Sequence, residues 1–284
     1  MYKVIASVDG SRSSPAVCDY AIWAARRLDA PLTFLHAINT PDGACEGELS
    51  GNLTFGVRDS LLSEMVEVED RRDKLAREQG KAVLADAVGR AVEQGVDDAG
   101  RLLRNGDVAD VLDKAQGEMR LLVLGKQGED GDALAEHIGS HLESTIRRVQ
   151  RPILVAPLAF RAPARFLIAY DGSPAATEVV EWIAGSPLLQ GLEAHLLLVD
   201  TDTEANRERL RSPRERLEAA GFTVRAEVRP GSSLDEEVCA YREEQGIHLI
   251  AMGAYGHSRL RHFFLGSTTT HMIMRASTPL LILR

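Results

Sequence analysis

The chain lacks the features that mark several large classes of protein. Its three cysteines (Cys18, Cys45 and Cys239) are scattered, and none has the spacing of a zinc site or a disulfide framework. No apolar run approaches the length of a membrane span, and the first residues lack the basic start and long apolar core of a signal peptide. The net charge of -9 argues against a nucleic-acid binder, which normally presents a basic face. These absences predict a cytoplasmic protein with no metal site and with neither nucleic acid nor a membrane as its partner.

Sequence signatures of catalysis are missing as well. There is no Gly-x-Ser-x-Gly nucleophile elbow, and no Walker lysine follows a glycine-rich turn. No obvious base is placed to activate a water molecule. We therefore expect no catalytic residues and a protein that is not an enzyme.

The chain does contain two copies of one pattern. Two short apolar strands, at 2–9 and 165–171, both end in Asp-Gly-Ser, and both lead into a helical pattern. The strands and helices that follow match in the same order. Each copy closes with an apolar strand led by proline, at 152–156 and 279–283. The 284 residues are enough for two medium domains, each with its own core.

This alternation of strands and helices predicts an α/β fold with parallel sheets covered on both faces. We expect two tandem domains, at 1–158 and 164–284, each an open, five-stranded, Rossmann-like parallel sheet. The copies differ mainly at 39–99 of the first, a long segment whose centre, 59–94, is charged and helical in pattern. An insertion is the simplest interpretation of that segment.

Each copy also carries a glycine-rich segment between a strand and a helix. In the second copy, Gly253 and Gly256 are followed after nine residues by Gly266 and Ser267, at the start of a helical pattern. Glycines let the backbone approach a ligand closely, and the N–H groups at a helix start favour anions. Ser267 is also a good N-cap, so a purely structural role is the alternative.

The two glycine segments differ in spacing and in charge. The spacer of the second copy is basic, with His257, Arg259, Arg261 and His262. The first copy has ten residues between Gly128 and Gly139, and its acids are Glu129, Asp130, Asp132 and Glu136. Basic neighbours favour a phosphate ligand, whereas the acids repel it, with only Lys126 and His137 to offset them. A solvated surface loop is the alternative explanation of the basic spacer.

With these motifs the chain resembles the universal stress protein family over nearly its whole length. Nucleotide-binding members share the pattern Gly-x2-Gly-x9-Gly-Ser/Thr, which the second copy matches in full, and the family fold is an adenine nucleotide alpha hydrolase-like open sheet. The resemblance implies that ATP, with or without Mg2+, binds in the second domain. It places Asp171 near the ribose and phosphates. The other positions that it assigns to the nucleotide are Ala169, Val199, Met252, Thr268 and Thr269.

We therefore expect a regulatory nucleotide-binding protein of the stress response, with weak or no binding in the first domain. Two alternatives remain open. One is a slow ATPase or phosphotransferase that uses His257 or His262, or that phosphorylates one of its own serines. The other is a scaffold that needs no nucleotide.

The closing strands predict how the domains associate. An exposed apolar strand edge invites aggregation, and dimers of the family pair through such strands. We expect the two domains to pair within one chain as a pseudo-dimer, and the sequence leaves open whether two chains then form a homodimer.

Three polar residues have simple structural explanations. Asp171 begins a common Asp-Gly-Ser turn, in which its side chain can bond to the nearby backbone. His36 and His195 occupy matching strand positions, and we expect them to be held by hydrogen bonds rather than to bind metal.

Overall fold

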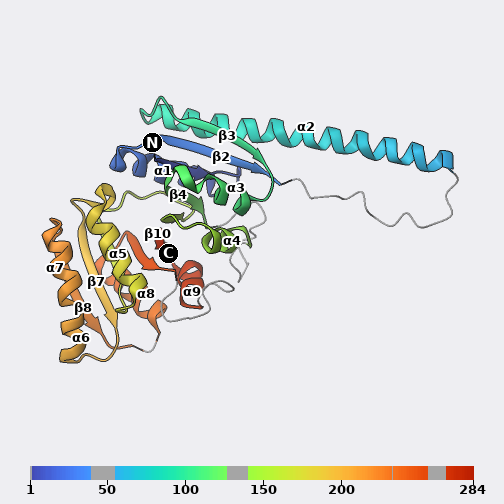
Figure 1. Ribbon diagram of the computed structural model, residues 1–284. Coiled ribbons are helices and arrows are strands. Elements are labelled where there is room, and N and C mark those ends of the chain that lie inside the picture. The colour runs from blue at the N-terminus through green and yellow to red at the C-terminus, as the bar shows by residue number, and fades with distance from the viewer. Residues whose placement is uncertain (1, 40–54, 127–139, 232, 255–266) are drawn as a thin grey trace.

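A computed structural model describes most of the chain (Figure 1). The described residues are 2–39, 55–126, 140–231, 233–254 and 267–284, and for 55–64, 140 and 267 only the backbone is described.

The first half of the chain alternates strands with helices. Its strands are β1 (Lys3–Ser7), β2 (Leu32–Ile38), β3 (Gly100–Asn105), β4 (Met119–Gly125) and β5 (Ile153–Ala156). Its helices are α1 (Ser14–Leu28), α2 (Phe55–Glu93), α3 (Val108–Ala115) and α4 (Ser140–Arg148), with a 3-10 turn η2 (Gln116–Glu118).

The second half repeats this order. Its strands are β6 (Arg165–Ala169), β7 (Glu193–Val199), β8 (Val224–Arg229), β9 (Leu249–Gly253) and β10 (Leu280–Leu283). Its helices are α5 (Pro174–Gly185), α6 (Glu204–Arg209), α7 (Arg211–Ala219), α8 (Leu234–Gln245) and α9 (Ser267–Arg275), with a 3-10 turn η3 (Pro187–Leu189).

The ten strands of the described residues form one sheet, in the order β3-β2-β1-β4-β5-β10-β9-β6-β7-β8. Every neighbouring pair is parallel except β5 and β10, which run antiparallel with Leu154 opposite Leu281. Each half is therefore a five-stranded parallel sheet, which confirms the predicted fold class. The two closing strands cover one another's edges, and all their residues are buried. The domain limits at 158 and 164 stay predictions.

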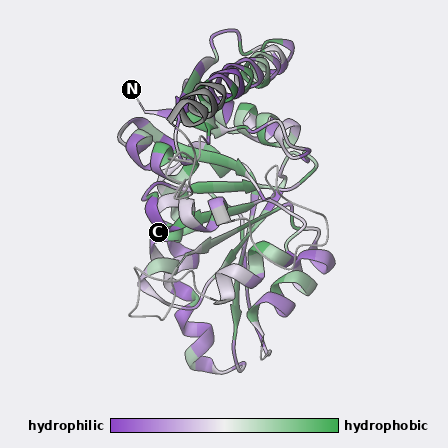
Figure 2. Ribbon diagram, turned by 90° about the vertical axis from the view of Figure 1, so that its right-hand side faces the viewer, coloured by the Kyte–Doolittle hydropathy of each residue, from purple (hydrophilic) through white to green (hydrophobic). Residues whose placement is uncertain are grey.

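The sheet has two apolar faces, each covered by helices. One face buries Ile168 and Leu198 in a cluster with α1, α5 and the last turns of α2. The other buries Leu167 and Leu197 in a cluster with α3, α4, α8 and α9. Because side chains alternate along a strand, both faces need apolar residues, and inner strands such as β4 and β9 are nearly continuous apolar runs (Figure 2).

Helix α2 occupies the segment that distinguishes the first half. The predicted helix at 59–94 is present, and it begins four residues earlier, at Phe55. Its C-terminal part packs on the sheet, where Leu84 and Ala91 are buried. Its earlier turns extend away from the rest of the molecule (Figure 1).

The two strand histidines have hydrogen-bond partners, as expected. His36 Nδ1 lies 2.8 Å from the carbonyl oxygen of Val8, and His195 Nδ1 lies 2.9 Å from the hydroxyl of Tyr241. His195 is only 1% exposed, and this burial lowers the pKa of its imidazole. Both histidines therefore have structural roles in the sheet.

Candidate functional site

A sheet of this topology is expected to leave a crevice outside the carboxyl ends of the two strands where the order reverses, here β6 and β9. From β6 the chain moves to β7 and β8 on one side and then returns to β9 and β10 on the other. The adjacent strands β6 and β9 are in register at Ile168 and Ala251, so their carboxyl ends lie side by side. Ligands of doubly wound sheets bind at such a point, where the strand order reverses. Asp171 follows one of these strands and Gly253 ends the other.

Three of the sequence-predicted positions meet at this edge. Ala169 ends β6, Val199 ends β7 and Met252 lies one residue before the end of β9. All three belong to, or pack against, the same apolar cluster, and Ala169 and Met252 are 8% and 4% exposed. The predicted positions thus form one apolar wall at the ends of three neighbouring strands.

Gly253 has a packing requirement that the sequence did not reveal. A Cβ atom at this position would lie 2.8 Å from Cβ of Ala175 and 3.2 Å from its carbonyl carbon. Ala175 belongs to the first turn of α5, so the end of β9 and the start of α5 approach closely. A side chain at position 253 would push them apart.

The start of α9 is tied to the end of β9. Thr269 is 3% exposed, and its hydroxyl donates a hydrogen bond of 2.8 Å to the carbonyl of Ala254. Its side chain is therefore used within the protein, whereas Thr268 in the same turn is exposed. Of Ser267 only the backbone is described. Four predicted positions lie outside the described residues: Gly256, His257, Arg259 and Gly266.

The Asp-Gly-Ser turn of the second half is held by its own hydrogen bonds. Oδ1 of Asp171 accepts from the backbone N–H of Ser173 at 2.9 Å, and Gly172 has a φ of 75°. Ser173 in turn caps α5, because its hydroxyl oxygen accepts from the N–H of Ala176 at 3.2 Å. This is the structural explanation that the sequence suggested for the aspartate.

Arg209, the last residue of α6, is not part of any motif that the sequence shows, yet it lies at this turn. Its guanidinium donates to the carbonyl of Asp171 at 2.5 Å and to Oδ1 of Asn206 at 3.0 Å. A Cβ atom on Gly172 would lie 2.5 Å from Nη2 of Arg209, so the guanidinium lies directly over the turn. The side chain is 43% exposed. It places a positive charge at this edge of the sheet, where Nη1 lies 3.8 Å from Oδ2 of Asp200.

The first half has a different neighbour at the matching turn. Oδ1 of Asp9 accepts from the N–H of Ser11 at 2.9 Å and from the hydroxyl of Ser14 at 3.0 Å. A Cβ atom on Gly10 would lie 2.9 Å from Val83 of α2. Where the second half places an arginine, the first half places an aliphatic side chain. The two copies thus differ in charge at this turn.

Lys126, in the glycine segment of the first half, bonds to the other half. Its ammonium donates to the carbonyls of Met274 at 2.5 Å and Ala276 at 3.2 Å, at the C-terminal end of α9. Burial lowers the pKa of this lysine. From the sequence, Lys126 is expected to offset the acids of its own spacer. Its described contacts instead cap a helix of the second half.

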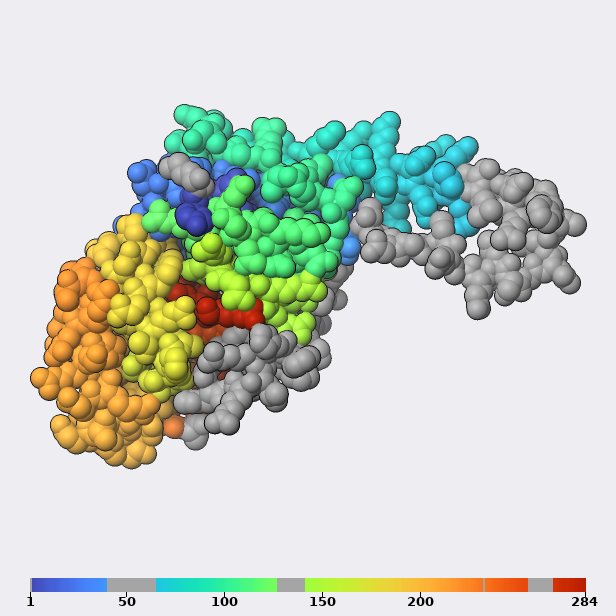
Figure 3. All heavy atoms as spheres, in the orientation of Figure 1, coloured from blue at the N-terminus to red at the C-terminus, as the bar shows by residue number. Residues whose placement is uncertain are grey.

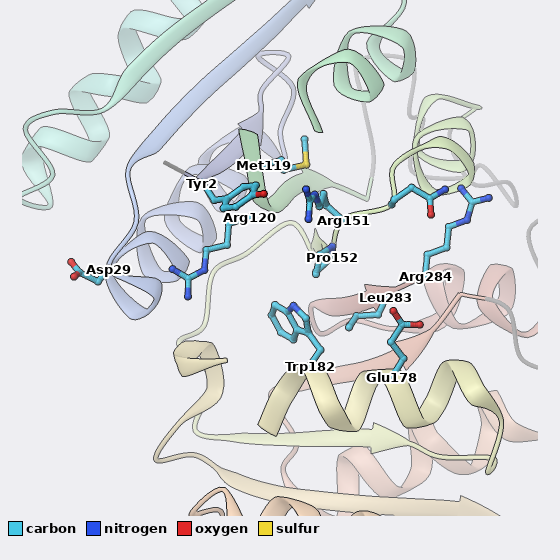
Figure 4. A pocket seen from close by; sticks show the side chains of 11 residues that line it. Tyr2, Asp29, Met119, Arg120, Arg151, Pro152, Glu178, Trp182, Leu283 and Arg284 are labelled. Atoms are coloured by element: carbon cyan, nitrogen blue, oxygen red, sulfur yellow. The ribbon is translucent and has the colours of Figure 1, made fainter. Parts of the chain in front are cut away.

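A cavity of about 450 Å³ lies between the two halves (Figure 4). Three arginines among its lining residues each donate to a carbonyl at the end of a helix. Arg120 donates to Leu28 of α1 at 2.8 Å, Arg151 donates to Gln116 after α3 at 3.1 Å, and Arg284 donates to Arg147 of α4. These hydrogen bonds provide donors for carbonyl groups at the C-terminal ends of helices. The arginines of the cavity are therefore explained by the fold, with no need for a bound ligand.

The other chemically active side chains do not form a second site in the described ranges. Burial raises the pKa of the Cys18 thiol to about 12, and it also raises that of Cys239, so neither is a reactive thiolate. Within the same ranges there is no group of three or more His, Cys, Asp or Glu that can hold a metal ion. None of the described helices is long and apolar enough to cross a membrane.

Comparison with known proteins decides the family. The sequence profile of the Universal stress protein family matches residues 1–157 and 193–284. The chain belongs to the universal stress protein family. It is similar to the universal stress protein Slr1230 of Synechocystis sp., with 32% identity over 291 aligned residues and 100% of both proteins covered. A universal stress protein of Mycolicibacterium smegmatis is 24% identical over 100% of this chain and 97% of that protein.

A solved structure agrees with this assignment. The universal stress protein from Archaeoglobus fulgidus superposes with a TM-score of 0.71 at 20% identity, covering 99% of this chain and 96% of that one. At that identity the likeness supports the fold alone. The two profile matches fall in the two halves of this universal stress protein, and residues 158–192, with Ala169 and Asp171, lie between them.

Proposed function

We propose that this universal stress protein binds ATP in its second half and acts as a cytoplasmic regulatory protein of the stress response. The observation that carries the proposal is the convergence of Ala169, Val199 and Met252 at the β6–β9 crevice. These apolar side chains suit the flat face of an adenine ring. The start of α9 lies next to the end of β9, and the N–H groups of a helix start suit phosphates.

A positive charge in the second half also favours phosphate binding there. The guanidinium of Arg209 lies over the turn at Gly172, next to the aspartate that the family resemblance places near the ribose and phosphates. Arginine binds phosphate oxygens through charge-assisted hydrogen bonds. Mg2+ would be held chiefly by the phosphates themselves, as this ion keeps few protein ligands.

The first half is proposed not to hold ATP. Its spacer between Gly128 and Gly139 is acidic, and Val83 lies over the turn where the second half has Arg209. We propose that this half serves as a structural partner, joined to the second half as a pseudo-dimer through β5 and β10. Its lysine, Lys126, caps α9, the helix whose other end belongs to the proposed site.

The function is tested by combining an ATP titration with a phosphate-release assay on the full-length protein. The proposal expects saturable ATP binding with no phosphate release above the buffer blank. Steady release that scales with protein concentration would favour the slow ATPase. No detectable binding would favour the scaffold that needs no nucleotide.

The Arg209→Met variant tests the contribution of this arginine to ATP binding. We expect the dissociation constant for ATP to rise about tenfold, or about 1.4 kcal/mol, because one charge near the phosphates is lost. The matched control is Arg207→Met on the same helix, whose partner is Asp202 at the surface. The control should bind ATP like the wild type in calorimetry. Equal ATP affinities for the wild type and both variants would show that Arg209 does not contribute to ATP binding.

A further inference from the structure

The first turns of α2 form a helix without support from the rest of the described chain. Every described residue from 65 to 75 is exposed, and Gly80 is the first buried residue along the helix. Contact with the fold begins there, where a Cβ atom on Gly80 would lie 2.7 Å from the ring of His36 and 2.8 Å from Leu103. Figure 3 shows this part of α2 extending beyond the body of the molecule.

This projecting segment carries an unusual share of exposed apolar side chains. Of the eight large apolar side chains that the described residues expose, four lie here: Met65, Val66, Val68 and Leu75. Val68 and Leu75 are 64% and 66% exposed. Met65, Val68 and Leu75 are three and seven residues apart, so they lie along one side of the helix. An apolar stripe of this kind marks an interaction surface.

The charges of the segment are sorted along its length. Residues 65–70 contain three acids and no base. Residues 71–81 contain five bases and two acids. Some of these charges can pair within the helix at a spacing of four residues, as Asp70 and Lys74 do in sequence. Such pairs stabilise an isolated helix, but they do not cover its apolar stripe.

We propose that residues 65–81 of α2 form an interface between two copies of this chain, with the two helices antiparallel. In that arrangement the acidic part of each helix faces the basic part of the other. A parallel arrangement would place acids on acids and bases on bases. The same surface is used by both copies, as a two-fold axis requires.

The closing strands cannot provide this contact, because β5 and β10 already cover one another within the chain. A pair of short helix segments buries less than the area of a standard stable interface. We therefore expect a weak dimer, seen at high protein concentration, that dissociates as salt screens the charges.

Sedimentation velocity of the full-length protein over a range of concentrations tests the interface. The wild type should show a monomer–dimer equilibrium, and the double variant Val68→Asp/Leu75→Asp should stay monomeric. The matched control is Val92→Asp, on the same helix and 46% exposed but outside the segment, which should dimerise like the wild type. The proposal is overturned if the wild type stays monomeric up to about 1 mM. A dissociation constant of that size corresponds to a binding free energy of about 4 kcal/mol. A double variant that dimerises equally well also overturns the proposal.

A charge variant tests the orientation. Glu67→Lys/Asp70→Lys should weaken the antiparallel dimer, because the acidic part then repels the basic part of the partner. In a parallel dimer the same change relieves repulsion between like charges, so stronger association would contradict the antiparallel arrangement. Thermal unfolding of each variant should match the wild type, because all the changed side chains are exposed.

Discussion

Replacing Gly266 with valine is expected to abolish ATP binding by the full-length protein. Gly266 precedes α9 in the intact glycine pattern, and a branched side chain there would block the approach of phosphates to the helix start. The matched change in the first half, Gly139→Val, should leave the affinity for ATP unchanged. Calorimetric titration of both variants with ATP measures the difference.

Both glycines lie outside the described residues, so the thermal midpoint of each variant must be measured beside its affinity. A Gly266→Val protein that unfolds like the wild type and still binds ATP would exclude the second half as the proposed site. Loss of binding in Gly139→Val, with unchanged thermal stability, would assign the nucleotide to the first half.

Replacing Gly253 with alanine is expected to lower the free energy of unfolding by about 1–3 kcal/mol, the usual cost of an added methyl group in a filled interior. The new Cβ atom would lie 2.8 Å from Cβ of Ala175, and backbone atoms of the same residue lie within 3.4 Å. Helix α5 must therefore move away from the end of β9. Because this movement opens the crevice, ATP affinity should fall as well.

Gly185→Ala is the matched control, because Gly185 ends the same helix and a Cβ atom there meets nothing within 4 Å. Urea unfolding should show a lower midpoint for Gly253→Ala and a nearly unchanged midpoint for Gly185→Ala. Equal midpoints for the wild type and Gly253→Ala would contradict the close contact between β9 and α5.

Much of the fold could be predicted because its signals are local. The closing strands predicted at 152–156 and 279–283 are present as β5 and β10, and the helix predicted at 59–94 is present as α2. Buried parallel strands are continuous apolar runs, and the repeated Asp-Gly-Ser turns show where each half begins again. The apolar positions of the crevice, such as Ala169 and Met252, could be placed once the strand ends were known.

The remaining features depend on contacts between distant segments. Arg209 lies 38 residues after Asp171, and no local pattern joins them. Lys126 lies in a glycine segment, yet it caps α9 almost 150 residues later. The reason for a glycine at position 253 is the approach of α5, which only the packed structure reveals. Side chains whose partners lie far away along the chain form no motif of fixed spacing, so the sequence alone does not reveal them.

The central claim is that one chain with two related halves holds one nucleotide, in its second half. The most direct test is calorimetric titration of the full-length wild type with ATP, using protein freed of any nucleotide that copurifies. The account predicts saturation at one ATP per chain. Saturation at two ATP per chain, or no saturable binding at all, would contradict it.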